Sequence, residues 1–213
     1  MREMKGLGAA RGWWWGALIA GLWLVLPLGA ETAIVIETEL GVIEAVLEDE
    51  KAPATVANFL QYVDAGHYSG GQFFRTVRTK PDNQPKVPVK IDVIQAGVNP
   101  EFEKKTFPPV RLERTKETGL KHVDGVLSMP RFAPDSGTNG FSICIGDQPN
   151  MDFGGRRNPD GQGFAVFGRV TSGMEVARKI HASPSGPNET DQVVAMGDQR
   201  LTPPIKLLSI RRR

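Results

Sequence analysis

The chain has 213 residues, of which 40% are hydrophobic and 23% are charged, and its formal net charge is +2. All of this excess charge lies in residues 1–30, which hold three basic residues and one acidic residue, so residues 31–213 are neutral overall. A neutral domain lacks the basic surface that nucleic-acid binding requires. The single cysteine, Cys144, excludes an intramolecular disulfide, and no paired-ligand spacing indicates a metal site.

Residues 1–30 have the composition of an export segment. A basic front precedes a charge-free stretch of eighteen residues, which ends in the small residues Gly29 and Ala30. This pattern predicts a signal peptide that is cut after Ala30. Leu28 is larger than the residue usual at that position and the stretch is barely long enough to span a bilayer, so a retained N-terminal membrane anchor is the alternative. Both interpretations predict an exported domain, periplasmic or otherwise extracytoplasmic.

Residues 31–213 fit a single domain of ordinary size. At its start, residues 33–38 and 42–47 are two strand-like runs on either side of a short turn, a pattern that predicts an antiparallel hairpin. Pro53 suits the first position of a helix and Gly66 suits the position after its end. Apolar residues recur between them at helical spacing, so a helix over residues 53–65 is predicted to pack on the sheet.

Two further strands are predicted, one starting at Phe73 and the other ending at Gly97. Alternate side chains of an extended strand share a face. Phe73 and Arg75 are therefore expected on one surface, with Phe74 pointing away. Arginine stays charged and presents its donors in a rigid plane, which suits recognition of an amide group.

Three irregular stretches separate the predicted elements. Residues 79–90 carry three prolines, which cannot donate to a β-ladder, so they form an inserted loop that is either a functional flap beside Arg75 or a tolerated surface insertion. Residues 99–119 are expected to wrap the outside of the fold. Residues 147–163 are rich in loop-forming residues, and their aspartates do not have the spacing of a calcium loop.

The second half of the chain contains short strands and one more predicted helix. The strands are expected at residues 125–129, 141–145, 165–170 and 205–210, and the helix at residues 174–181. Phe141, Ile143 and Ile145 share one face of their strand and are expected in the core.

Several short motifs occur in a defined order along the chain. They are Asn58-Phe59, Gly66-His67-Tyr68, Phe73-Phe74-Arg75, Ile94-Gln95-Ala96-Gly97, Gly125 to Met129, Thr138 to Ile143, Val166 to Val170 and Gly173-Met174. Each motif is weak by itself, but the ordered set resembles the cyclophilin family of peptidyl-prolyl isomerases, from about Ile34 to the C-terminus. The resemblance implies a mainly β fold, a closed eight-stranded antiparallel β-barrel capped by two α-helices.

The resemblance assigns catalysis to Arg75 and Gln95. Rotation about an X-Pro bond requires weakened amide resonance and needs no nucleophile, metal or cofactor. Arg75 would donate to the prolyl nitrogen as the bond twists and Gln95 would contact a carbonyl, so the twisted state is bound more tightly than the planar one. The expected partners are proline-containing polypeptides, and the chain is expected to be a monomer.

The apolar floor for the proline ring departs from the family pattern. Phe74 and Phe164 stand where the family usually has histidines, Ser142 stands where it has an aromatic residue, and Asn150-Met151 aligns with the usual Trp-Leu pair. Phe141 is equally suited to the barrel core. The candidate substrate-binding residues are Phe73, Phe74, Met129, Phe141, Ser142, Met151 and Phe164.

Two functions are compatible with these residues. The first is a peptidyl-prolyl isomerase that assists the folding of exported proteins, where prolyl isomerisation limits the rate. The second is a proline-peptide-binding or chaperone module on the same barrel with little or no turnover, because its floor is remodelled. A hydrolase is disfavoured, because no nucleophile-elbow pattern occurs and His67, His122 and His181 lack a recognisable serine partner.

Overall fold

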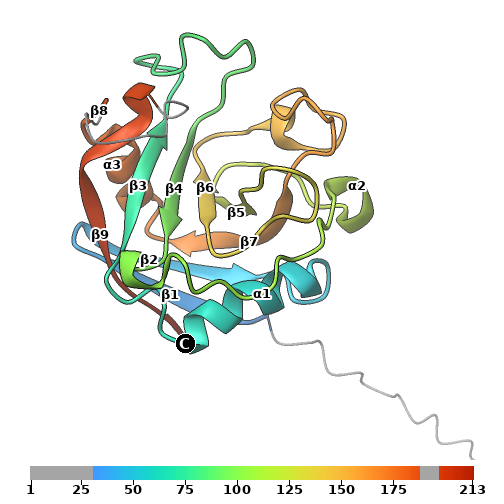
Figure 1. The fold of residues 1–213 in the computed structure, drawn as a ribbon, viewed down its shortest axis with the longest axis vertical. Coiled ribbons are helices and arrows are strands. Elements are labelled where there is room, and N and C mark those ends of the chain that lie inside the picture. Colours follow the sequence, from blue (N-terminus) through green and yellow to red (C-terminus); the bar gives the residue numbers. More distant parts are fainter. Residues whose placement is uncertain (1–30, 188–196) are drawn as a thin grey trace, which may run out of the picture. The chain divides into compact units, whose positions relative to one another are not determined.

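Eight antiparallel strands close into a barrel in the computed structural model, which describes residues 31–187 and 197–213 (Figure 1). Neighbouring strands follow the order β1-β2-β7-β5-β6-β4-β3-β9, and pairing between β1 and β9 closes the ring. The strands are β1 (Ala33–Thr38), β2 (Gly41–Leu47), β3 (Gly71–Val77), β4 (Val93–Gly97), β5 (Val126–Met129), β6 (Phe141–Cys144), β7 (Ala165–Ser172) and β9 (Arg200–Arg212), with the two-residue β8 (Ser185–Gly186) beside β9. The predicted barrel is confirmed.

The described residues contain three α-helices, one more than the sequence predicts. The helices α1 (Pro53–Asp64) and α3 (Met174–Ala182) match the two predicted helices closely. The third, α2 (Thr115–Thr118), is a single turn that ends at Gly119 in the left-handed region, with φ 73°. Short 3₁₀ turns occur at η1 (Pro100–Phe102), η2 (Pro149–Met151) and η3 (Gly197–Gln199). No helix of this part of the chain is long and apolar enough to cross a membrane.

Aromatic rings fill the barrel interior. Phe59 of α1 lies with its ring centroid 5.4 Å from Tyr68, 5.7 Å from Phe141 and 5.2 Å from Phe167. Phe73 completes this group at 5.8 Å from Phe141. All five rings are buried, and such tilted and edge-to-face contacts add to the free energy gained by burying their area. The helix α1 is therefore fixed to the barrel by its apolar face, as its helical spacing predicts.

The N-terminus of α1 is capped by a distant side chain. Its N-cap residue, Ala52, has no side-chain acceptor. Glu113 takes that role, because its carboxylate accepts the backbone N–H groups of Ala54 and Thr55 at 3.1 and 2.8 Å. A buried carboxylate here satisfies free donors and compensates the positive end of the helix dipole. The segment 99–119 thus wraps the barrel, as expected, and also anchors α1.

Candidate active site

A groove of about 360 Å³ lies on the outer face of the barrel wall. Residues of strands β3, β4, β5 and β6 line it, together with the segment 130–140 and the loop that contains residues 147–163. A second apolar cluster, separate from that of the barrel interior, borders the groove: Val77, Ile91, Val93, Val126, Cys144, Met151 and Val166. Its members Val77, Ile91, Val93 and Met151 line the groove. Five candidate site residues line the groove together, namely Arg75, Gln95, Ser142, Met151 and Phe164.

A β-bulge at Phe74 directs Arg75 into this groove. Phe73 pairs with Ala96 of β4, but Arg75 pairs with Gln95, so one residue of β3 is extra at Phe74. A bulge shifts the alternation of faces by one residue. Phe73 is consequently buried in the barrel, while Arg75 faces outward. The expectation that Phe73 and Arg75 share a surface is therefore wrong, because it assumed a regular strand.

Four candidate substrate-binding residues do not line the groove. Phe73 and Phe141 are fully buried among the aromatic rings of the barrel interior, with no exposed surface. Met129 is buried in the main core cluster, and it borders a separate cavity of only about 10 Å³. The ring of Phe74 lies over Gly97. A Cβ atom added to that glycine would be 3.4 Å from the ring. The alternation of side chains along each strand and the bulge in β3 direct these four side chains away from the groove.

The Arg75 guanidinium is held by two side-chain amides. Its Nη1 donates to Gln95 Oε1 at 3.0 Å, and its Nε and Nη2 both donate to Gln199 Oε1, at 2.9 and 2.6 Å. These contacts use three of the five N–H donors of an arginine, so two are left for a substrate. Neutral amide oxygens orient the group without neutralising its charge.

Burial of Arg75, with a smaller contribution from the positive charge of Arg157, lowers the pKa of Arg75 to about 10. The side chain therefore stays charged at neutral pH. A partly desolvated cation also acts more strongly on a neighbouring dipole than one in water does, because the local dielectric constant is lower.

Gln199 and Arg157 are site residues that the sequence analysis missed. Gln199 is buried at the end of η3, 124 residues after Arg75, and its Nε2 donates to Asn83 O at 3.2 Å. Arg157 lines the groove from the loop that follows η2. Neither residue belongs to a motif with a recognisable spacing, so only the tertiary structure identifies them.

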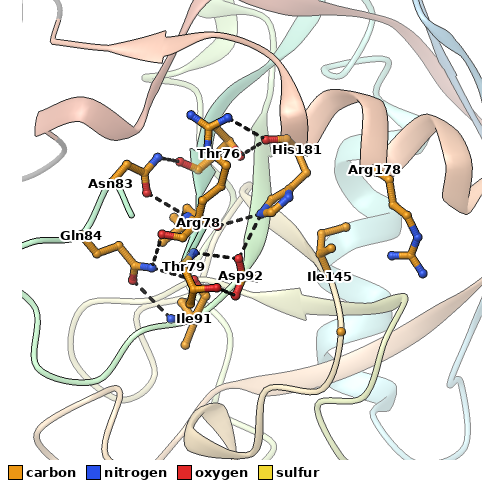
Figure 2. Close-up of polar contacts among 12 residues, drawn as sticks. Thr76, Arg78, Thr79, Asn83, Gln84, Ile91, Asp92, Ile145, Arg178 and His181 are labelled. Atoms are coloured by element: carbon orange, nitrogen blue, oxygen red, sulfur yellow. Dashed lines mark hydrogen bonds and ion pairs between the residues drawn. The ribbon is translucent and has the colours of Figure 1, made fainter. Parts of the chain in front are cut away.

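The insertion 79–90 is bound to the residues that follow β3 and precede β4 through Asn83 and Gln84 (Figure 2). Asn83 accepts the Arg78 N–H at 2.8 Å and donates to Thr76 O at 2.9 Å. Gln84 Nε2 donates to the carbonyls of Arg78 and Ile91, at 3.0 and 2.8 Å. Both amide side chains are buried, so the insertion is an ordered part of the wall beside Arg75.

The same region is tied to the end of α3. Thr79 donates through its N–H and its hydroxyl to the Asp92 carboxylate, both at 2.8 Å. His181 Nε2 lies 3.0 Å from Val77 O and 3.5 Å from Asp92 Oδ1. Figure 2 draws the contact between His181 and Asp92. Burial lowers the pKa of His181, so the neutral ring that donates to the carbonyl is favoured.

A serine, a histidine and an aspartate are linked by hydrogen bonds at the groove, where Ser128 is one of the lining residues. His122 Nδ1 is 2.8 Å from Asp152 Oδ1, and its Nε2 is 2.9 Å from Ser128 Oγ. The expectation that His122 lacks a serine partner is thus wrong, because β5 brings Ser128 back to it. Both Ser128 and His122 are 1% exposed, which leaves no room for a substrate carbonyl. We assign a structural role to these contacts: they fix the position of the loop that carries Met151 into the groove.

The described residues contain no group of three or more His, Cys, Asp or Glu side chains arranged to hold a metal ion. The groove is lined by guanidinium and amide groups and by the apolar side chains of Met151 and Phe164.

Comparison with known proteins identifies the family. Residues 33–211 match the family model of the cyclophilin type peptidyl-prolyl cis-trans isomerases. The chain belongs to this family. A peptidyl-prolyl cis-trans isomerase A of Dickeya dadantii is 38% identical over 150 residues, which are 70% of each chain. A peptidyl-prolyl cis-trans isomerase of Acinetobacter baylyi is 30% identical over 195 residues, which are 91% of this chain and 92% of that protein.

Solved structures of cyclophilins have the same fold. A cyclophilin type isomerase of Cryptosporidium parvum superposes with a TM-score of 0.63 at 19% identity, covering 86% of this chain and 98% of that chain. This cyclophilin is accordingly a peptidyl-prolyl cis-trans isomerase, the enzyme class that the ordered motifs predict.

Proposed function

We propose that this cyclophilin accelerates rotation about X-Pro bonds of exported proteins outside the cytoplasm and so assists their folding. The observation that carries the catalytic part is the Arg75 guanidinium, which is charged, partly desolvated and clamped in the groove by Gln95 and Gln199. The part that concerns export rests on the composition of residues 1–30.

Arg75 acts on the prolyl nitrogen in this mechanism. In the planar amide the nitrogen lone pair is delocalised, and the barrier to rotation is about 20 kcal/mol. As the bond twists, the lone pair leaves conjugation and becomes a better acceptor. A free N–H of Arg75 then donates to it, so the guanidinium binds the twisted state more tightly than the planar state. Because the clamp fixes the guanidinium beforehand, little reorganisation is needed when the bond rotates.

One hydrogen bond does not supply the whole acceleration. A 10⁵-fold rate increase requires about 7 kcal/mol, so contacts to the neighbouring backbone and an apolar floor for the ring must contribute. In our proposal Met151 and Phe164 provide that floor, and Ser142 leaves room beside it. Gln95 would bind a substrate carbonyl through its Nε2, because its Oε1 is occupied by Arg75.

Two measurements test this function. In an isomerase assay with short X-Pro peptides, the purified protein should accelerate cis–trans exchange, and Arg75→Ala should abolish most of the acceleration while its circular dichroism stays unchanged. Cell fractionation tests the location: the protein should be recovered outside the inner membrane, with an N-terminus at Glu31 if residues 1–30 are removed. Recovery of the uncut chain in the soluble cytoplasm would contradict the exported role.

A further inference from the structure

Among the residues that the structure describes, three arginines and no carboxylate line the groove. Arg75, Arg131 and Arg157 border it, and no Asp or Glu is among the described residues that line it. Concave sites bordered by charges of one sign concentrate the electrostatic potential and attract ligands of the opposite sign. The described lining of the groove therefore carries positive charge and no negative charge, although residues 31–213 as a whole are neutral.

Only one of these arginines has its charge compensated by a described carboxylate. Arg131 forms a two-pronged ion pair with Asp160, at 2.7 and 2.9 Å, and its side chain is 2% exposed. Arg157 donates to neutral oxygens instead, from Nη1 to Gln84 Oε1 at 2.8 Å and to Val89 O at 2.7 Å. Both acceptors belong to the insertion 79–90. Within the described ranges Arg157 forms no ion pair, so the insertion holds a charged guanidinium at the groove without neutralising it.

Arg157 and Arg75 both line the groove, and their like charges repel each other. The charge of Arg157 contributes to the lowered pKa of Arg75, and burial lowers the pKa of Arg157 itself. Placing two partly desolvated cations in one site costs free energy, and a bound anion lowers that cost. A carboxylate on the bound peptide would relieve this repulsion and would form charge-assisted hydrogen bonds with the remaining donors of Arg157.

We propose that Arg157 is a specificity residue that selects X-Pro segments with an acidic side chain close to the proline. This inference rests on the proposed function and adds a substrate class to it. An extended peptide advances about 3.4 Å per residue, and charges interact effectively over a Debye length of about 10 Å. The acidic residue should therefore lie within about three residues of the proline, and the insertion 79–90 has the role of holding Arg157 in position.

The test uses the purified protein and pairs of peptides that differ only in Glu or Gln, placed at each of the positions that flank the proline. Exchange is followed by NMR without a coupling protease, because a protease would itself respond to the acidic residue. At the most favourable position of the acidic residue, we expect kcat/KM to be at least about five-fold higher for the Glu peptide than for the Gln peptide. This ratio corresponds to a free-energy difference of about 1 kcal/mol at 25 °C. This ratio should fall as the salt concentration is raised, because screening weakens exposed charge pairs.

Variants at Arg157 decide whether this residue is responsible. Arg157→Gln should bring the Glu-to-Gln ratio close to one, and Arg157→Glu should reverse the preference in favour of Lys peptides. Arg156→Gln is the matched control, because Arg156 is exposed, lies next in the chain and does not line the groove. It should keep the wild-type ratio.

Three results would overturn the proposal: ratios close to one at every position of the wild-type protein, a preference that survives Arg157→Gln, or a preference that Arg156→Gln also removes. Failure of the proposed function looks different, because no peptide of either kind would then be isomerised. In that case NMR titration of peptide binding still compares Glu with Gln, so the acidic preference is tested independently of turnover.

Discussion

Gln199 Oε1 accepts two hydrogen bonds from the Arg75 guanidinium, from Nε at 2.9 Å and from Nη2 at 2.6 Å. The Nε2 of the same amide donates to Asn83 O in the insertion, so the amide cannot rotate without losing three contacts. A side chain just before the last strand thus fixes the orientation of the arginine that β3 presents. The acceptor is neutral, which preserves the charge of Arg75 for the substrate.

Gln199→Ala should lower kcat about ten-fold and change peptide affinity little. The reason is that Gln199 positions Arg75 and does not contact the substrate, and one factor of ten corresponds to about 1.4 kcal/mol. Measurement of kcat by exchange spectroscopy and of Kd by titration separates the two effects. In the Arg75→Ala background the same substitution should have no further effect on kcat, because the group it positions is absent. Additive losses in this double-mutant cycle would mean that Gln199 acts in another way.

Substitutions at Arg75 and Gln95 should lower the turnover rate to different extents. Arg75→Ala should lower turnover far more than it weakens peptide binding. Arg75→Lys should recover only part of the rate. Lysine is a compact donor and lacks the planar guanidinium that forms hydrogen bonds with both Gln95 and Gln199. Gln95→Ala should give an intermediate loss, because it removes one neutral hydrogen bond worth about 1 kcal/mol. Full activity of a folded Arg75→Ala protein would show that the assignment of Arg75 is wrong.

Glu113 should be important for stability, although it lies far from α1 in sequence. Glu113→Ala leaves buried donors of Ala54 and Thr55 without a partner and should lower the free energy of unfolding by about 2–3 kcal/mol. Glu113→Gln keeps one acceptor oxygen and should cost less. Urea unfolding measures both values. Glu117→Gln is a suitable control, because this more exposed carboxylate forms only a surface pair with Arg114 and should change stability by less than about 1 kcal/mol.

His181 should make the fold less stable in mildly acidic solution. Burial lowers its pKa in the folded state, so below pH 6.5 the unfolded chain binds a proton that the folded chain does not. The free energy of unfolding should therefore fall as the pH decreases through 6.5 toward the lowered pKa, by at most about 1.4 kcal/mol per pH unit for this one group.

The comparison with His181→Gln isolates that contribution. Glutamine keeps an N–H donor for Val77 O but does not titrate. Unfolding free energies measured between pH 7.5 and 5.5 should show a shallower pH dependence for the variant than for the parent protein. Identical slopes would mean that His181 ionises equally in both states.

Much of the barrel could be predicted from local sequence patterns. The hairpin of β1 and β2, the helices α1 and α3 and most of the strands follow from alternation, helical spacing and turn residues. The motifs that contain Arg75 and Gln95 were also visible, and the structure brings these two side chains into contact at 3.0 Å. Such features are encoded by residues close together in the chain, which explains why periodicity and spacing are enough.

Other features of the site were decided by the tertiary structure alone. The bulge at Phe74 separates Phe73 from Arg75, because β3 must pair with β4 and β9 at the same time, and no local pattern contains that requirement. Gln199 and Arg75 form a hydrogen bond although 124 positions separate them in the sequence, and Arg157 and Gln84 do so over a separation of 73 positions. Hydrogen bonds of this kind form only after barrel closure has positioned their backbones, so they depend on the whole fold and leave no periodic pattern in the sequence.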